Sequence, residues 1–219
     1  MTTMILRWLL LPLGIAATIW VWMLPDAAGF KDPGQARILC FHLPCAVLST
    51  ILVITAGVAG VARLQSERPL WDGRLIAAFE LGTLFAVLTL TTGICFSKPQ
   101  WGDWWHNDPR QTSFLVVCIM LAAGLALRAG LTDDKAKARA TAVYAIAIQL
   151  PFIFLTFVFP RLPGVITLHP NNTIVDRGID YYYTSGLLAV GLILGIASYL
   201  MFRDRTRLEV LEHELAEAA

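Results

Sequence analysis

Six long apolar stretches constrain the fold of this 219-residue chain more than any other feature. A helix needs about 20 mostly apolar residues to cross the hydrocarbon core of a bilayer. Only short polar connections separate the six stretches. The predicted spans lie near residues 5–25, 38–62, 75–97, 113–131, 140–160 and 181–202. The sequence therefore predicts an all-α integral membrane protein with six transmembrane helices.

The composition agrees with a chain that lies mostly in lipid. Hydrophobic residues make up 57% and charged residues 15%, whereas soluble domains have about half and about a quarter. Disorder, coiled coil and nucleic-acid binding are excluded on this ground. The first apolar run exceeds the core of a signal peptide and lacks a cleavage site, so we expect it to stay as an anchor. The cysteines have no zinc-site spacing and are expected to be small buried hydrophobes: Cys40, Cys45, Cys95 and Cys118.

Lysine and arginine are divided unequally between the two sides that alternating spans define. The side of the amino terminus has eleven of the 17, and the opposite side has six. Because basic residues favour the cytoplasmic side, we predict that both termini are cytoplasmic. Residues 1–202 then form the membrane domain and residues 203–219 a short cytoplasmic tail helix. The outer, periplasmic loops are predicted at 26–37, 98–112 and 161–180.

Histidines are the first candidates for binding a metal. His42 opens the second span and His169 lies in the last outer loop, so both fall at the same membrane face. Neutral imidazole is a common metal ligand, and two on one apolar face suit a six-coordinate haem iron. The alternative is two interfacial polar residues that never meet. His213 falls in the tail and is expected at the surface, while His106 lies in an outer loop.

The segment SKPQWGDWWHNDPRQTS, residues 97–113, combines aromatic, acidic and basic side chains at a span boundary. Tryptophan is enriched at membrane interfaces, so an anchoring belt is one interpretation. The clustering of tryptophans in the sequence beside a glycine, an acid and an arginine favours a second interpretation, a shaped platform for a planar ligand. Its members are Trp101, Gly102, Trp104, Trp105, Asp108 and Arg110.

Glu80 is an acid inside the third predicted span. An ionisable residue within a membrane indicates a functional site by default. Because Glu80 stands several helical turns from the outer end of its span, a transport pathway and a structural hydrogen bond both remain open.

The pattern Trp-Gly-x-Trp-Trp-x-x-Asp-x-Arg-x-Thr over residues 101–112 resembles the tryptophan-rich WWD signature of the haem-handling proteins of cytochrome c assembly. With six spans and one such motif, the chain resembles the CcmC family most closely. ARILCFHLPCAVLS and LPFIFLTFVFPRLPGVITLHP resemble the two histidine segments of that family, so the similarity covers most of residues 37–180. The chain departs from the family at Asn107, where Trp is common, and at Gln111, where Leu is common. A Trp that usually precedes the second histidine segment is also missing.

The resemblance implies that His42 and His169 are axial ligands of haem b at the outer face. It implies a platform beside the haem, formed by the residues that match the motif: Trp101, Gly102, Trp104, Trp105, Asp108, Arg110 and Thr112. The implied location is the bacterial cytoplasmic (inner) membrane. The implied partners are a CcmE-type haem chaperone that receives haem, the ABC transporter CcmA/CcmB and a CcmD-like small membrane protein.

Other functions remain open from the residues alone. An electron-transfer cytochrome b subunit usually carries its histidines well inside its spans, and no histidine here is deep. A non-haem membrane transporter or assembly scaffold would not require paired outer histidines. The sequence has no classical catalytic constellation, and a haem lyase-like role in attaching haem to the chaperone stays undecided.

Overall fold

The computed structural model describes residues 2–169 and 180–218 and consists, within them, of helices joined by short loops. Residues 170–179 of the predicted last outer loop lie outside the described part. Three short helical turns accompany the main helices: η1 (Gly34–Ile38), the π-helical η2 (Phe154–Val158) and η3 (Phe159–Arg161). The α-helices are α1 (Thr2–Trp22), α2 (Leu39–Gln65), α3 (Pro69–Trp101), α4 (Pro109–Ala129), α5 (Asp134–Ala147), α6 (Gln149–Ile153) and α7 (Tyr181–Ala218).

The prediction of six spans is confirmed, since six helical stretches are long and apolar enough to cross a membrane. The fifth span is composite and runs through α5, α6, η2 and η3. Two helices are longer than the sequence predicts. The 33-residue α3 ends only at Gly102, whose φ of +102° is favourable for glycine and stops the helix. The 38-residue α7 continues through the predicted tail without a break.

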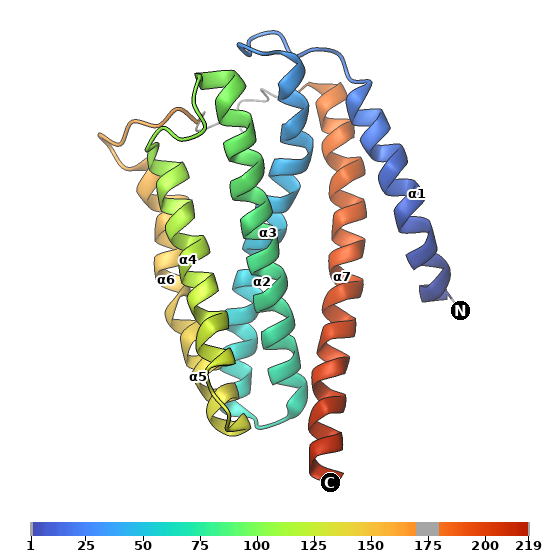
Figure 1. The fold of residues 1–219 in the computed structure, drawn as a ribbon, viewed down its shortest axis with the longest axis vertical. Coiled ribbons are helices and arrows are strands. Elements are labelled where there is room, and N and C mark those ends of the chain that lie inside the picture. Colours follow the sequence, from blue (N-terminus) through green and yellow to red (C-terminus); the bar gives the residue numbers. More distant parts are fainter. Residues whose placement is uncertain (1, 170–179, 219) are drawn as a thin grey trace.

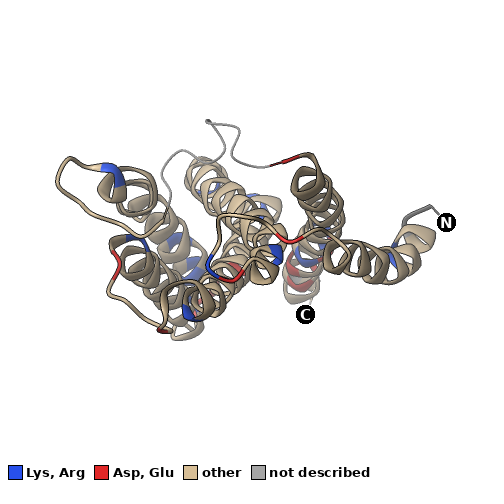
Figure 2. Ribbon diagram, turned by 90° about the horizontal axis from the view of Figure 1, so that it is seen from above, with Lys and Arg blue, Asp and Glu red and all other residues tan. Residues whose placement is uncertain are grey.

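The helices stand side by side, with α2 and α3 at the centre of the bundle and α1 at its rim beside α7 (Figures 1 and 2). The core forms where α2, α3, α4 and α5 meet, around the fully buried Phe79 of α3. Gly124 of α4 permits close packing there, because a Cβ on it would lie 2.5 Å from Cζ of Phe79. Three cysteines are buried as predicted, but Cys95 is exposed, so the prediction is wrong for that residue.

The loops lie at two opposite ends of the bundle, as expected when successive spans alternate in direction (Figure 1). The α2–α3 and α4–α5 connections and the end of α7 lie at the lower end. The segments 23–33, 102–108 and 162–169 lie at the other end, called here the upper end. The upper end therefore corresponds to the face predicted to be outer.

A chain of ion pairs joins α3, α4 and α7 near the lower end. Arg128 donates to both carboxylate oxygens of Asp72, at 3.1 and 3.0 Å, and also to Glu209. Arg205 binds the other oxygen of Glu209 at 2.7 Å and pairs with Glu80 at 2.8 Å. The structure thus gives Glu80 an ion-pair partner, which is a structural role. The charges of the predicted tail hold α7 against its neighbours.

The first prediction concerns this ion-pair chain. Arg128→Met leaves the buried Asp72 and the largely buried Glu209 without their shared cation. Removing one partner of a buried pair costs about 3 to 5 kcal/mol. We expect the free energy of unfolding, measured by denaturant titration in detergent, to fall by about this amount. Arg139→Met, on the exposed side of α5, is the control and should change it by less than about 0.5 kcal/mol. Equal losses would contradict the role given to Arg128.

The second prediction concerns which end faces the cytoplasm. The charge bias assigns the lower end to the cytoplasm. A reporter that is active only in the periplasm should be silent when inserted at Ser66 and active at Gly164, both of which lie in loops. Colony activity and immunoblots of expression would measure this, and the reverse pattern would invert the assignment.

Candidate functional site

The two histidines singled out from the sequence come together at the upper end. His42 lies in the first turns of α2 and its Nδ1 is 3.0 Å from Oγ1 of Thr92 in α3. His169 closes the segment that follows η3. The two imidazoles lie close enough to interact electrostatically. Residues 127 positions apart in sequence thus lie near each other at the upper end, and their joint binding of one metal stays a prediction.

Asp108 ties His169 to the start of α4. Its carboxylate caps the helix by accepting from the backbone N–H of Arg110 at 2.9 Å. It also accepts from the hydroxyl of Thr167 at 2.8 Å and from the N–H of Leu168 at 2.6 Å. Nδ1 of His169 lies 3.3 Å from Oδ1 of Asp108 without the alignment of a hydrogen bond. One buried carboxylate therefore fixes both a helix end and the segment that carries the second histidine.

The electrostatics of this pair follow from burial and from hydrogen bonds. Burial alone would raise the pKa of Asp108, but the donors Leu168, Thr167 and Arg110 and the charge of His169 hold it below its usual range. The pKa of His169 is lowered mainly by burial, against the opposing effect of Asp108. Around neutral pH, Asp108 is ionised and His169 is neutral, which is the form of imidazole that binds metals.

A row of aromatic rings starts at His169. The Trp101 ring packs against the imidazole in an edge arrangement at a centroid distance of 5.1 Å. Phe96 packs against Trp101 at 5.6 Å, and Phe30 of the first upper segment packs against Phe96 at 5.9 Å. This row links three parts of the chain. Trp101, which the sequence places in a loop, is the last residue of α3 and is held by the helix.

The remaining motif residues lie less close to the histidines. Trp104 is 54% exposed, and the half-buried Trp105 donates from Nε1 to Oδ1 of Asn107 at 2.9 Å. Thr112 is exposed on the first turn of α4 and Gly102 ends α3. Arg110, half-buried, lies within electrostatic reach of Arg161 and Asp108. The structure thus brings His42, His169, Trp101 and Asp108 together and leaves Trp104 and Thr112 at the surface.

The two departures from the motif have structural roles in the loop. Asn107 adopts a φ of +51°, a conformation that asparagine tolerates better than tryptophan. Gln111 is buried and spans the loop: its Oε1 accepts from His106 N–H at 3.1 Å, and its Nε2 donates to the Trp104 carbonyl at 3.1 Å. Sequence reasoning noted Gln111 only as a departure from the motif and missed Thr92 and Thr167, because polar residues at span ends carry no distinctive pattern.

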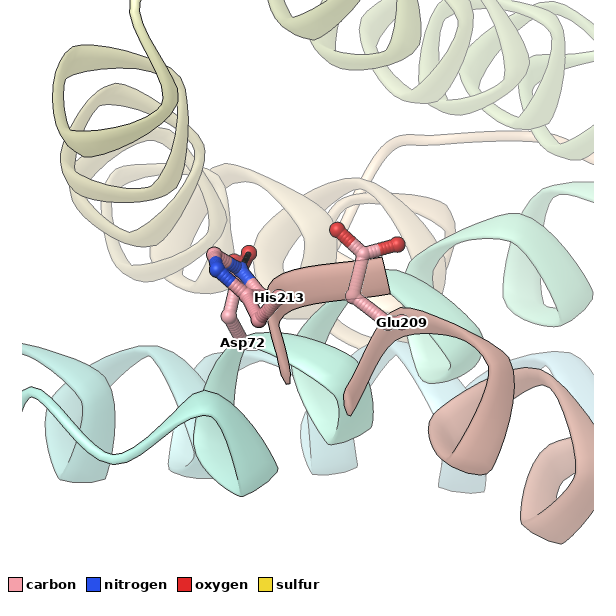
Figure 3. A group of neighbouring side chains, drawn as sticks. All are labelled: Asp72, Glu209 and His213. Atoms are coloured by element: carbon pink, nitrogen blue, oxygen red, sulfur yellow. Dashed lines mark ion pairs between the residues drawn. The ribbon is translucent and has the colours of Figure 1, made fainter. Parts of the chain in front are cut away.

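A second group of acidic and histidine side chains lies at the lower end (Figure 3). Ligand atoms of Asp72, Glu209 and His213 lie within 4.8 Å of one another. Arg128, however, donates to both carboxylates, and Arg205 pairs with the other oxygen of Glu209, so these oxygens already face cations and the group is an ion-pair cluster. His213, expected at the surface, is half-buried and lies 3.6 Å from Asp72.

The fold and the site define a class: a polytopic helical membrane protein with two histidines and a tryptophan-rich loop at one end. The family model for CcmC, described as "Heme exporter protein C", matches residues 1–219. The chain therefore belongs to the CcmC family.

Individual relatives agree with this assignment. The chain is 26% identical to Heme exporter protein C of Escherichia coli (strain K12) over 211 residues, 94% of this chain and 84% of the relative. It is 30% identical to Heme exporter protein C of Bradyrhizobium diazoefficiens over 207 residues, 92% of this chain and 76% of the relative. A ccmC-like mitochondrial protein of cytochrome c biosynthesis from Marchantia polymorpha is 31% identical over 193 residues, 88% of this chain and 78% of the relative.

The third prediction tests the tether at Asp108. Asp108→Asn keeps the size of the side chain but replaces an accepting oxygen by an amide that donates. Hydrogen bonds to a charged group are worth about 1.5 to 3 kcal/mol, so the Leu168 amide should exchange roughly ten- to a hundredfold faster. Hydrogen exchange with mass spectrometry over residues 162–169 would measure this. Asp103→Asn, which changes an exposed acid in the same loop, should leave the exchange unchanged; an identical effect there would refute the tether.

Proposed function

We propose that this chain binds haem b at its upper, periplasmic end and delivers it to a CcmE-type haem chaperone in the bacterial inner membrane. The observation that carries the proposal is that two histidines from separate elements lie at the same end of the bundle, His42 against Thr92 of α3 and His169 against Asp108 and Trp101. Neither Nε2 makes a hydrogen bond to the described part of the chain. Two uncommitted imidazole nitrogens at one apolar face match the two axial positions of a haem iron.

The surroundings of His169 fit a metal-binding histidine. Nδ1 of His169 is buried and lacks a well-formed hydrogen bond, while a carboxylate stands 3.3 Å away. Metal-binding histidines commonly turn their second nitrogen to such a carboxylate, which orients the ring and raises its basicity. Binding of a metal at Nε2 would draw Nδ1–H toward Asp108.

The aromatic row offers apolar contact for a porphyrin beside the ligands. Trp101 lies directly against His169, and the half-buried Trp105 belongs to the adjoining loop. Arg110, near both Asp108 and Arg161, adds positive charge at the same end, which suits the carboxylates of haem. When bound, haem supplies the iron, and the chain supplies ligands, orientation and an apolar surface.

Delivery to a chaperone is supported by the family and by the position of the site. The name of the relatives in Escherichia coli and Bradyrhizobium states that they export haem. A site at the end of the bundle is accessible to a partner outside the membrane, and Trp104 is 54% exposed there. We propose the CcmA/CcmB transporter and a CcmD-like small protein as further partners in the membrane. The family match disfavours an electron-transfer cytochrome b or a non-haem scaffold.

The fourth prediction tests the ligands. His42→Gly and His169→Gly each remove one nitrogen ligand, so the purified protein should change from a low-spin to a high-spin haem spectrum or lose haem. Added imidazole should restore part of the low-spin absorbance in both variants. Mixing the wild-type protein with a purified CcmE-type chaperone should move the haem absorbance to the chaperone.

His106→Gly is the control for this experiment. His106 lies in the same loop, and its Nε2 accepts from the Asp103 N–H at 3.3 Å, so the variant should keep the low-spin spectrum. If His106 proves necessary while either proposed ligand is dispensable, the ligand assignment is wrong. If the wild-type protein takes up no haem, the proposed function is wrong as a whole.

A further inference from the structure

Thr92 stands between α3 and the imidazole of His42. Its hydroxyl lies 2.7 Å from the carbonyl of Leu88 and 3.0 Å from that of Thr89, within its own helix. On the other side its oxygen lies 3.0 Å from Nδ1 of His42. A threonine hydroxyl has one proton to donate and lone pairs to accept with.

The position of that proton follows from the distances. The Leu88 carbonyl is the nearest acceptor, and donation to the carbonyl four residues back is the usual arrangement for threonine in a helix. The oxygen of the hydroxyl then accepts a hydrogen bond from His42, so Nδ1 must carry the hydrogen. The group of α3 that faces Nδ1 thus accepts the hydrogen bond.

The close approach of the ring to α3 depends on Gly93. A Cβ at this position would lie 3.3 Å from Cε1 of His42 and 3.7 Å from Nδ1. The edge of the imidazole that carries Nδ1 and Cε1 is therefore against the helix. A neutral imidazole with hydrogen on Nδ1 has its lone pair on Nε2.

We infer that Thr92 is a positioning residue that holds His42 in the Nδ1–H tautomer and so makes Nε2 its metal-binding nitrogen. The inference rests on the proposed function for the identity of the ligand, but its tautomer part holds for the protein without haem. It also makes the two ligands unequal. His169 faces the carboxylate of Asp108, whereas His42 faces a neutral hydroxyl, so His169 is the more basic ligand.

Two variants and a matched control test the role of Thr92. Thr92→Val keeps the shape and removes the hydroxyl, while Thr92→Ser keeps the hydroxyl. Thr83→Val is the control, because Thr83 lies on the same helix and donates to the carbonyl of Phe79 at 2.8 Å without facing a histidine. Loss of the partner of a metal-binding histidine typically weakens binding by about ten- to a hundredfold. We expect this range for haem with Thr92→Val, and wild-type affinity with Thr92→Ser and Thr83→Val.

The tautomer itself is read from ¹⁵N chemical shifts of labelled histidine in the haem-free protein. The wild type and Thr92→Ser should show His42 with hydrogen on Nδ1, and Thr92→Val should shift the population toward Nε2–H. An Nε2–H tautomer in the wild type, or unchanged tautomer and haem affinity in Thr92→Val, would overturn the inference. A wild type with the Nδ1–H tautomer that binds no haem would instead refute the proposed function, and the control of the tautomer by Thr92 would stand.

Discussion

The constraint on which this structure depends is that a polar group in lipid must find its partner within the chain. Many threonines of the spans meet it locally, and Thr50, Thr55 and Thr83 each donate to the carbonyl four residues back. The buried hydroxyl of Thr156 is an exception among the described residues. The charged residues meet it across helices, as Glu80 does with Arg205. Because most buried polar groups form hydrogen bonds, a buried nitrogen that lacks a well-formed one, such as Nδ1 of His169, points to a candidate binding site.

The same constraint makes the two ends of the bundle chemically different. At the lower end, cations and carboxylates neutralise one another in a continuous chain from Asp72 through Arg128 and Glu209, which holds three helices together. At the upper end, polar groups fix loops onto helix ends, as Gln100 does by donating to the carbonyl of Asp32 at 2.7 Å. Within residues 2–169 and 180–218, Nε2 of His42 and Nε2 of His169 have no hydrogen-bond partner. The charges of the lower end pair with one another, whereas the upper end carries the proposed binding site.

The sequence predicted the fold well where length and hydropathy decide it, because a span needs only about 20 apolar residues in a row. It placed the ends of α3 too close together and did not predict that the tail helix continues the last span as α7, for a tertiary reason. Gln100 and Glu209 look solvated by type, yet they are buried against partners on other elements. Convergence of His42 with His169 did not follow from their spacing and was implied by the resemblance to the CcmC family. No sequence pattern indicated a role for Thr92, since threonine is common in membrane spans. Its role follows only from the position of His42 beside it.

The relative position of the two histidines depends on how α3 packs against α4. Thr92 and Gly93 of α3 locate His42, while Asp108 at the start of α4 locates the segment that ends in His169. The relative position of the two imidazoles thus depends on the contact between these two helices. In the bundle core that contact includes Gly124 against Phe79, where there is no room for even one additional carbon. The tightly packed core away from the site therefore helps to set the relative position of the two proposed ligands.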